Sequence, residues 1–134
     1  PGLKPAASKV FLTGSFWNSP VEMAASLKTI QLLENQGGIE VMRQRGEAFA
    51  AGLAGAAQRA GLSVRVTGPP ALPFMHFEND PNYRLRHAFA RACHEGGLFI
   101  HPHHNWFLST AHTEQDIRLA VDIAARAFET AKAA

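Results

Sequence analysis

The chain has 134 residues, 46% of them hydrophobic and 18% charged, which is the size and composition of one folded domain and rules out disorder as the default state. No apolar run approaches the roughly 20 residues that a membrane-spanning helix needs. Thirteen basic and eleven acidic residues, spread along the chain, leave a net charge of +2. This distribution does not indicate a nucleic-acid partner.

A single cysteine, Cys93, cannot form an internal disulfide, which is typical of a reducing compartment and favours the cytoplasm. Residues 1–5 contain no long apolar stretch of the signal-peptide type. The chain begins with Pro1 instead of Met, from which we expect a processed or cut end. Together these features predict a soluble cytoplasmic protein with no membrane partner.

An apolar run over residues 10–17, broken by glycine, predicts a short extended stretch that turns. A helix is then expected to begin at Ser19 and Pro20, because serine can cap a helix and proline is tolerated in the first turn. It should run to about Asn35 and stop at the glycines that follow. Apolar residues occupy most faces of this helix, so we expect a part of the protein outside this chain to cover it.

A second, amphipathic helix is expected from about residue 39 to 60, because its apolar residues fall three, four or seven positions apart. Residues 62–67 alternate with period two and predict a half-exposed strand. A Gly-Pro-Pro turn at 68–70 should lead into its hairpin partner at 72–77.

A third helix should be capped by Asp80 and close at two glycines, followed by a short buried strand over 98–101. Thr113 and Asp116 have the spacing of a capping box at the start of a last helix. This order of elements predicts an α+β fold, in which a short three-stranded antiparallel or mixed sheet is covered by helices.

The densest cluster of reactive side chains is His101, His103, His104 and Asn105, with His112 eight residues after His104. Two histidines two apart in an extended segment could share a metal ion, but no carboxylate or cysteine lies beside them, and metal motifs of recognised spacing are absent. The pattern favours a histidine-rich loop near a site or surface over a native metal site.

Thr13, Gly14 and Ser15 form a second candidate site, just ahead of the helix start at residues 19–20. Glycine exposes backbone amides, the hydroxyl donates a hydrogen bond, and a helix N-terminus favours negative charge, so a phosphate or carboxylate would suit this place. The alternative is a tight turn that feeds a capped helix.

The segment Phe-Leu-Thr-Gly-Ser-Phe-Trp-Asn-Ser-Pro over 11–20, followed by Val-Glu-Met-Ala-Ala-Ser-Leu at 21–27, resembles the G-T-x-x-x-N-P stretch of class III aminotransferases, which are fold-type I pyridoxal-phosphate enzymes. Residues 96–102 and 107–117 are similar to the final strand, substrate-side loop and last helix of one branch. That branch contains glutamate-1-semialdehyde 2,1-aminomutase and its aminotransferase relatives. The resemblance implies the C-terminal portion of such an enzyme.

In that family the lysine that forms the internal aldimine with pyridoxal 5'-phosphate lies well before the G-T motif. The resemblance therefore implies that this chain lacks the lysine, holds no catalytic residue, and neither binds the cofactor nor reacts by itself. Ser15 stands in place of the family's threonine, so Gly14 and Ser15 are expected to contact the cofactor phosphate of the neighbouring subunit in a homodimer.

Where many family members carry an arginine for a substrate carboxylate, this chain has His101, His103, His104 and Asn105, which implies substrate-side roles for them. The expected substrate is an amino acid or amino-aldehyde. Residues 1–36 would end the large-domain region, and 37–134 would form the small domain. Two alternatives stay open, a free-standing interaction module of this fold and a metal binder built on the histidine cluster.

Overall fold

The computed structural model describes residue 14 and residues 19–133. The chain divides into two compact units, Pro1–Gln36 and Gly37–Ala134. The extended stretch expected over residues 10–17 lies, apart from residue 14, outside the described residues.

The first unit contains helix α2, Pro20–Asn35, as the capping signals predict. Ser19 makes no side-chain bond to a backbone amide, and its hydroxyl pairs instead with the Glu22 carboxylate. None of the α2 residues is buried, and its large apolar side chains are exposed, including Val21, Met23, Leu27 and Ile30. Helix α2 therefore presents an unusually apolar surface.

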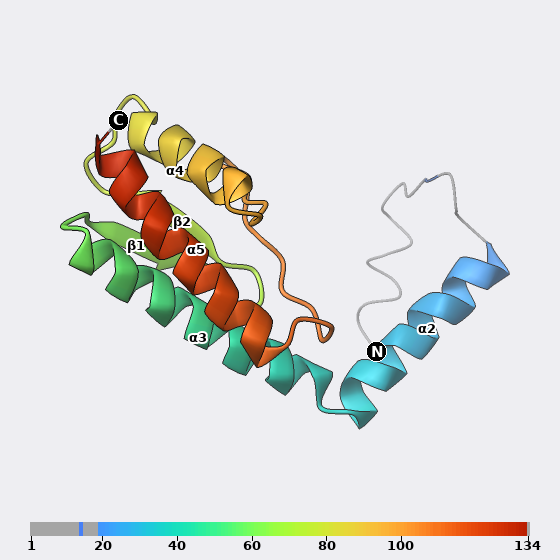
Figure 1. Cartoon of the computed structure of the whole chain (residues 1–134). Coiled ribbons are helices and arrows are strands. Elements are labelled where there is room, and N and C mark those ends of the chain that lie inside the picture. The colour runs from blue at the N-terminus through green and yellow to red at the C-terminus, as the bar shows by residue number, and fades with distance from the viewer. Residues whose placement is uncertain (1–13, 15–18, 134) are drawn as a thin grey trace. The chain divides into compact units, whose positions relative to one another are not determined.

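The second unit contains the other described elements, which are α3 (Gly38–Arg59), β1 (Val64–Thr67), β2 (Phe74–Phe77), α4 (Arg84–Glu95) and α5 (Glu114–Ala133) (Figure 1). Helix α5 packs against both α3 and α4, while β1 contacts α3 and β2 contacts α4. The two strands pair antiparallel, with Val64 opposite Phe77 and Thr67 opposite Phe74. The predicted α+β class is confirmed.

The sheet has two strands in the described part of the chain, and the third strand expected at residues 98–101 is not formed. The Leu98 amide donates to the Cys93 carbonyl at 2.8 Å and so closes α4. Ile100, only 6% exposed, is buried in the core. In this apolar run Ile100 is buried and Leu98 half-buried against the core, whereas Phe99 is exposed, and the segment forms a loop without a ladder of hydrogen bonds.

The chain returns to the sheet side of the unit a few residues later. The amides of Trp106 and Leu108 donate to the carbonyls of Pro73 and Ala71, both at 2.9 Å. These two bonds fix the segment that follows residues 101–105 to the residues that lead into β2. Residues 101–105 therefore lie between the Leu98–Cys93 hydrogen bond on one side and the Trp106–Pro73 hydrogen bond on the other. These bonds hold the loop in place although it does not belong to the sheet.

Helix α4 begins at Arg84, later than its predicted start beside Asp80. The Asp80 carboxylate nevertheless caps it, accepting hydrogen bonds from the amides of Leu85 and Arg86 at 3.1 and 2.9 Å. Tyr83, which lies between Asp80 and the first residue of α4, adopts a left-handed conformation with φ of 56°, which is uncommon for a residue with a side chain. The capping box of α5 is confirmed, because Thr113 and Asp116 exchange the expected hydrogen bonds at 2.7 and 3.2 Å.

The core is centred on three phenylalanines from a strand and two helices. Phe89 and Phe128 stack with ring centroids 4.4 Å apart, and Phe77 meets Phe128 edge-on at 5.9 Å. Helix α3 approaches the hairpin turn through Gly46, where a Cβ atom would lie 1.9 Å from the Pro70 carbonyl oxygen. Aromatic stacking and one close backbone approach therefore fix the elements of this unit to one another.

Candidate substrate-side loop

The histidine-rich loop over residues 101–105 follows α4 and faces solvent. His101, His103 and His104 are exposed, and Asn105 is half-buried. The His103 amide donates to His101 Nδ1 at 3.1 Å, and Trp106 Nε1 donates to the His101 carbonyl at 3.0 Å. The structure thus brings the predicted residues into one loop and gives that loop internal hydrogen bonds.

Three residues at the start of α4, Tyr83, Arg86 and His87, lie beside this loop, and the sequence alone did not predict a role for them. His87 Nε2 lies 3.0 Å from His103 Nε2, and the Tyr83 ring meets His103 edge-on with centroids 5.2 Å apart. The Arg86 guanidinium lies over the Tyr83 ring at 5.0 Å. Their spacing could have indicated that they lie together, because Arg86 and His87 follow Tyr83 by three and four positions and residues at this spacing share one face of a helix.

Arg86 is held by aromatic rings and a histidine rather than by a carboxylate. Its guanidinium lies 5.5 Å from the centroid of Phe74 on the sheet, and Nη2 lies 3.2 Å from His76 Nδ1. Its Nε atom is buried and has no hydrogen-bond partner among the described residues. A guanidinium in this position adds positive potential beside the histidine loop.

Burial, assisted by these positive charges, lowers the pKa of two histidines. Burial, and then the positive charges of Arg86 and Arg65, lower the pKa of His76 below its ordinary value. Desolvation lowers the pKa of His103, with further contributions from His87, Arg86 and His101. Both imidazoles are therefore kept neutral at pH 7, when each can donate one hydrogen bond and accept another.

These lowered pKa values predict that the chain loses stability on acidification. Below the unfolded-state pKa of about 6.5, the unfolded chain binds protons that folded His76 and His103 do not, so the free energy of unfolding falls as the pH drops. We expect the Tm to decrease from pH 7 to pH 5 in thermal unfolding followed by circular dichroism. The double variant His76→Gln/His103→Gln should show a shallower decrease. A wild-type Tm that stays level over this range would contradict the prediction.

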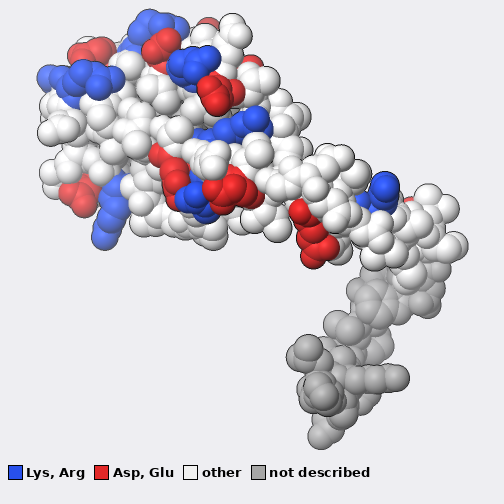
Figure 2. Space-filling model, turned by 90° about the horizontal axis from the view of Figure 1, so that it is seen from below, with Lys and Arg blue, Asp and Glu red and all other residues white. Residues whose placement is uncertain are grey.

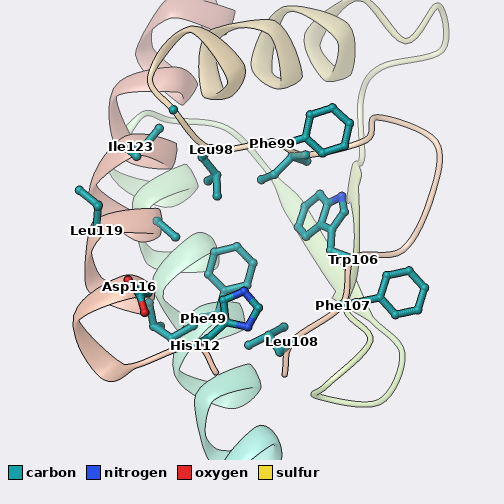
Figure 3. Close-up of a pocket in the computed structure, with 14 residues that line it drawn as sticks. Phe49, Leu98, Phe99, Trp106, Phe107, Leu108, His112, Asp116, Leu119 and Ile123 are labelled. Carbon is teal, nitrogen blue, oxygen red and sulfur yellow. The ribbon is translucent and has the colours of Figure 1, made fainter. Parts of the chain in front are cut away.

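A groove of about 300 Å³ lies beside the loop and is lined mainly by apolar side chains (Figure 3). Phe49 from α3, Ile123 from α5, and Leu98 and Trp106 on either side of the loop contribute to it. His112 and Asp116 supply its polar groups, and Phe107, 65% exposed, points away from it in the close-up. The groove can accept an apolar group next to the histidine loop.

At the groove, His112 is engaged in a turn rather than in a nucleophilic pair. Its Nδ1 atom accepts the Ser109 amide at 2.9 Å and lies 3.2 Å from the Ser109 hydroxyl. Hydrogen bonds from Thr113 lower the pKa of Asp116, and His112 and Arg45 lower it further. This arrangement orders the entry to α5.

The second predicted site lies almost wholly outside the described residues. Gly14 is exposed, and a Cβ atom added there would meet nothing within 4 Å. Ser15 is not among the described residues.

The described residues offer few groups for covalent or metal chemistry. They contain no group of three or more His, Cys, Asp or Glu side chains placed to hold a metal ion. Lys132 donates to the Ala60 carbonyl at 2.8 Å, and Lys28 is exposed on α2. Burial raises the pKa of the Cys93 thiol to about 12, so this residue is an inert part of the core.

On the face of the second unit seen in Figure 2, Lys and Arg alternate with Asp and Glu, and no large patch of one sign forms. One such mixed cluster is built on α3, where Arg43 pairs with Glu40 and Glu47. Among the described helices, none is both long and apolar enough to span a lipid bilayer.

The fold is that of the C-terminal domain of pyridoxal-phosphate-dependent transaminases. The FumI protein of Sphingopyxis sp. MTA144, solved in its PLP internal aldimine form, superimposes with a TM-score of 0.83 over 93% of this chain and 30% of its own, at 42% identity. An omega-transaminase from Sphaerobacter thermophilus shares the fold with a TM-score of 0.80 over 92% of this chain and 31% of its own, at 24% identity.

Sequence comparison leads to the same enzymes, although no protein-family model matches the chain. Aminopentol aminotransferase of Sphingopyxis macrogoltabida is 42% identical over 125 residues, which are 93% of this chain and 30% of that protein. Glutamate-1-semialdehyde 2,1-aminomutase of Desulforudis audaxviator is 32% identical, with 91% and 31% covered. The chain thus spans about 30% of the length of these relatives, and it matches the C-terminal part of pyridoxal-phosphate-dependent aminotransferases.

Proposed function

We propose that this chain supplies the small domain and a cofactor-phosphate contact of a pyridoxal-phosphate-dependent aminotransferase or aminomutase that acts on an amino acid or amino-aldehyde. The observation that carries the proposal is the match to FumI, which joins 42% identity with a TM-score of 0.83 over 93% of the chain. Pyridoxal phosphate, when bound, supplies an electron sink for the substrate's amino carbon. The chain alone is inactive in this proposal.

Residues 1–36 would contribute the phosphate contact, reaching the cofactor of the neighbouring subunit in a homodimer. Gly14 supports this role because it is exposed and has open space at its Cβ position. The Ser15 hydroxyl would donate to the phosphate, as an uncharged donor suits an anion near a helix N-terminus. The compartment proposed is the cytoplasm, in keeping with the free, buried thiol of Cys93.

The small domain, residues 37–134, would contribute the substrate side through His101, His103, His104 and Asn105. Residues 101–112 contain no acidic residue and no arginine, so the side chains of this loop offer imidazole, amide and hydroxyl groups for hydrogen bonding. Such a surface can form hydrogen bonds with a hydroxyl, an aldehyde oxygen or a carboxylate. The adjacent apolar groove would receive the carbon chain that carries that oxygen.

A chimera tests this proposal. Aminopentol aminotransferase of Sphingopyxis macrogoltabida, with the 30% of its length that matches replaced by this chain, should retain pyridoxal phosphate on gel filtration and turn over its own substrate. In the chimera, Ser15→Ala should weaken cofactor binding by about 1.5–3 kcal/mol, roughly ten- to a hundredfold.

Ser19→Ala is the matched control, because the Ser19 hydroxyl pairs with Glu22 in this chain, and its cofactor affinity should equal that of the parent chimera. Equal affinities for Ser15→Ala and the parent would remove the phosphate contact from the proposal. A folded chimera that holds the cofactor but has no turnover would remove the substrate-side role.

A further inference from the structure

His103 is the residue of the loop that is most closely held by another element. Its Nε2 atom lies 3.0 Å from His87 Nε2, and the two ring centroids are 4.8 Å apart at 65°. Tyr83, one helical turn before His87, meets the same imidazole edge-on. Helix α4 and the residue ahead of it therefore hold His103 from one side.

The loop itself holds His103 from the other side. Its amide donates to His101 Nδ1, and the His101 carbonyl accepts the Trp106 indole. Trp106 is in turn tied to Pro73 by its backbone amide. Among the described residues, the His103 imidazole has one side-chain hydrogen bond to a residue outside the loop, and its partner is His87.

We propose that His87 is a positioning residue, which fixes the imidazole of His103 in the substrate-side loop through a hydrogen bond between the two Nε2 atoms. The inference rests on the proposed function, because that function gives the loop its role. His87 does not need to touch substrate. It sets which nitrogen of His103 is turned toward α4 and leaves the other for a ligand.

The chemistry of two imidazoles makes this contact dependent on protonation. One Nε2 must carry a hydrogen and the other must present a lone pair, so the pair accepts one proton on a remote nitrogen but not two. The ionisable groups that act on His103 are His87, Arg86 and His101, the Tyr83 ring meets it edge-on, and His76 lies behind Arg86. No carboxylate is among these groups in the described part of the chain, so a second proton would separate the two rings and release the His103 side chain from α4.

The experiment uses the full 134-residue chain and follows imidazole titration by two-dimensional NMR together with amide hydrogen exchange. In His87→Ala, the pKa of His103 should rise toward its ordinary value, and the amides of residues 101–105 should exchange faster. His87→Gln should restore slow exchange, because its amide can donate to His103 Nε2. His94→Ala, which removes an exposed histidine from the last turn of the same helix, should leave His103 and the loop unchanged.

These experiments separate the positioning role of His87 from the substrate-side role of the loop. If His87→Ala leaves the titration of His103 and the exchange of the loop as in the wild type, the positioning role is overturned. If His87→Gln behaves like His87→Ala, the hydrogen bond is not what holds the loop, and the inference is likewise overturned. In the chimera, a His103→Ala variant with unchanged kcat/KM would overturn the substrate-side role while the pairing measured in this chain still stands.

Discussion

Replacing Phe128 with alanine is expected to lower the free energy of unfolding by about 3–5 kcal/mol, the range for a fully buried phenylalanine. Phe128 is 0% exposed and contacts the rings of both Phe89 and Phe77, which also contact each other. Truncation removes the apolar surface of the ring and leaves a cavity bounded by α4, α5 and the sheet, which these elements cannot all move to fill. Guanidinium unfolding followed by circular dichroism measures the loss.

Phe99→Ala is the matched control, since Phe99 is 78% exposed and the same truncation there should change stability by less than about 0.5 kcal/mol. A small effect at both positions would mean that the cluster of Phe77, Phe89 and Phe128 does not form the centre of the core. In a unit of this size, a loss of the expected magnitude at Phe128 takes away much of the total stability.

The second large effect is expected from Gly46→Ala, which should destabilise the chain by about 1–3 kcal/mol in spite of alanine's higher helix propensity. The new Cβ would lie 1.9 Å from the carbonyl oxygen and 2.3 Å from the carbonyl carbon of Pro70. Both are backbone atoms of the turn between β1 and β2, so α3 and the hairpin would have to separate.

Gly55→Ala in the same helix separates the two contributions. There the nearest atom to the new Cβ is the Arg59 Nη1, 3.4 Å away at the end of a flexible side chain. This variant should gain stability, by up to about 1 kcal/mol. Equal effects of the two substitutions in the same unfolding assay would show that contact with Pro70 does not limit position 46.

The sequence predicts what depends on local spacing. The helix from Pro20 to Asn35 and the capping box of Thr113 and Asp116 follow from side chains within a few residues of one another. The strand expected at 98–101 fails because its apolar residues indicate burial, which a loop against the core satisfies as well as a strand does. Whether a neighbouring strand is within reach is a property of the tertiary fold.

The candidate site divides in the same way. His101, His103 and His104 are adjacent in sequence, so their cluster can be recognised without a structure. His87 is 16 residues before His103 and reaches it only because the chain reverses after α4. The Arg86 guanidinium between Phe74 and Tyr83 depends on the same reversal together with the position of β2. The sequence thus shows the histidine cluster, whereas the neighbours of that cluster on α4 are identified only from contacts in the folded structure.

The attachment of the histidine loop at both ends has a consequence for how such a protein can diversify. Leu98 is tied to Cys93 on one side, and Trp106 and Leu108 are tied to Pro73 and Ala71 on the other, all through backbone atoms that any side chain leaves intact. The exposed residues between these ties, His101, His103 and His104, can therefore accumulate substitutions while the buried Ile100 and the backbone ties keep the fold in shape. Evolution can therefore change the ligand-binding side chains of this loop without changing the backbone that supports them.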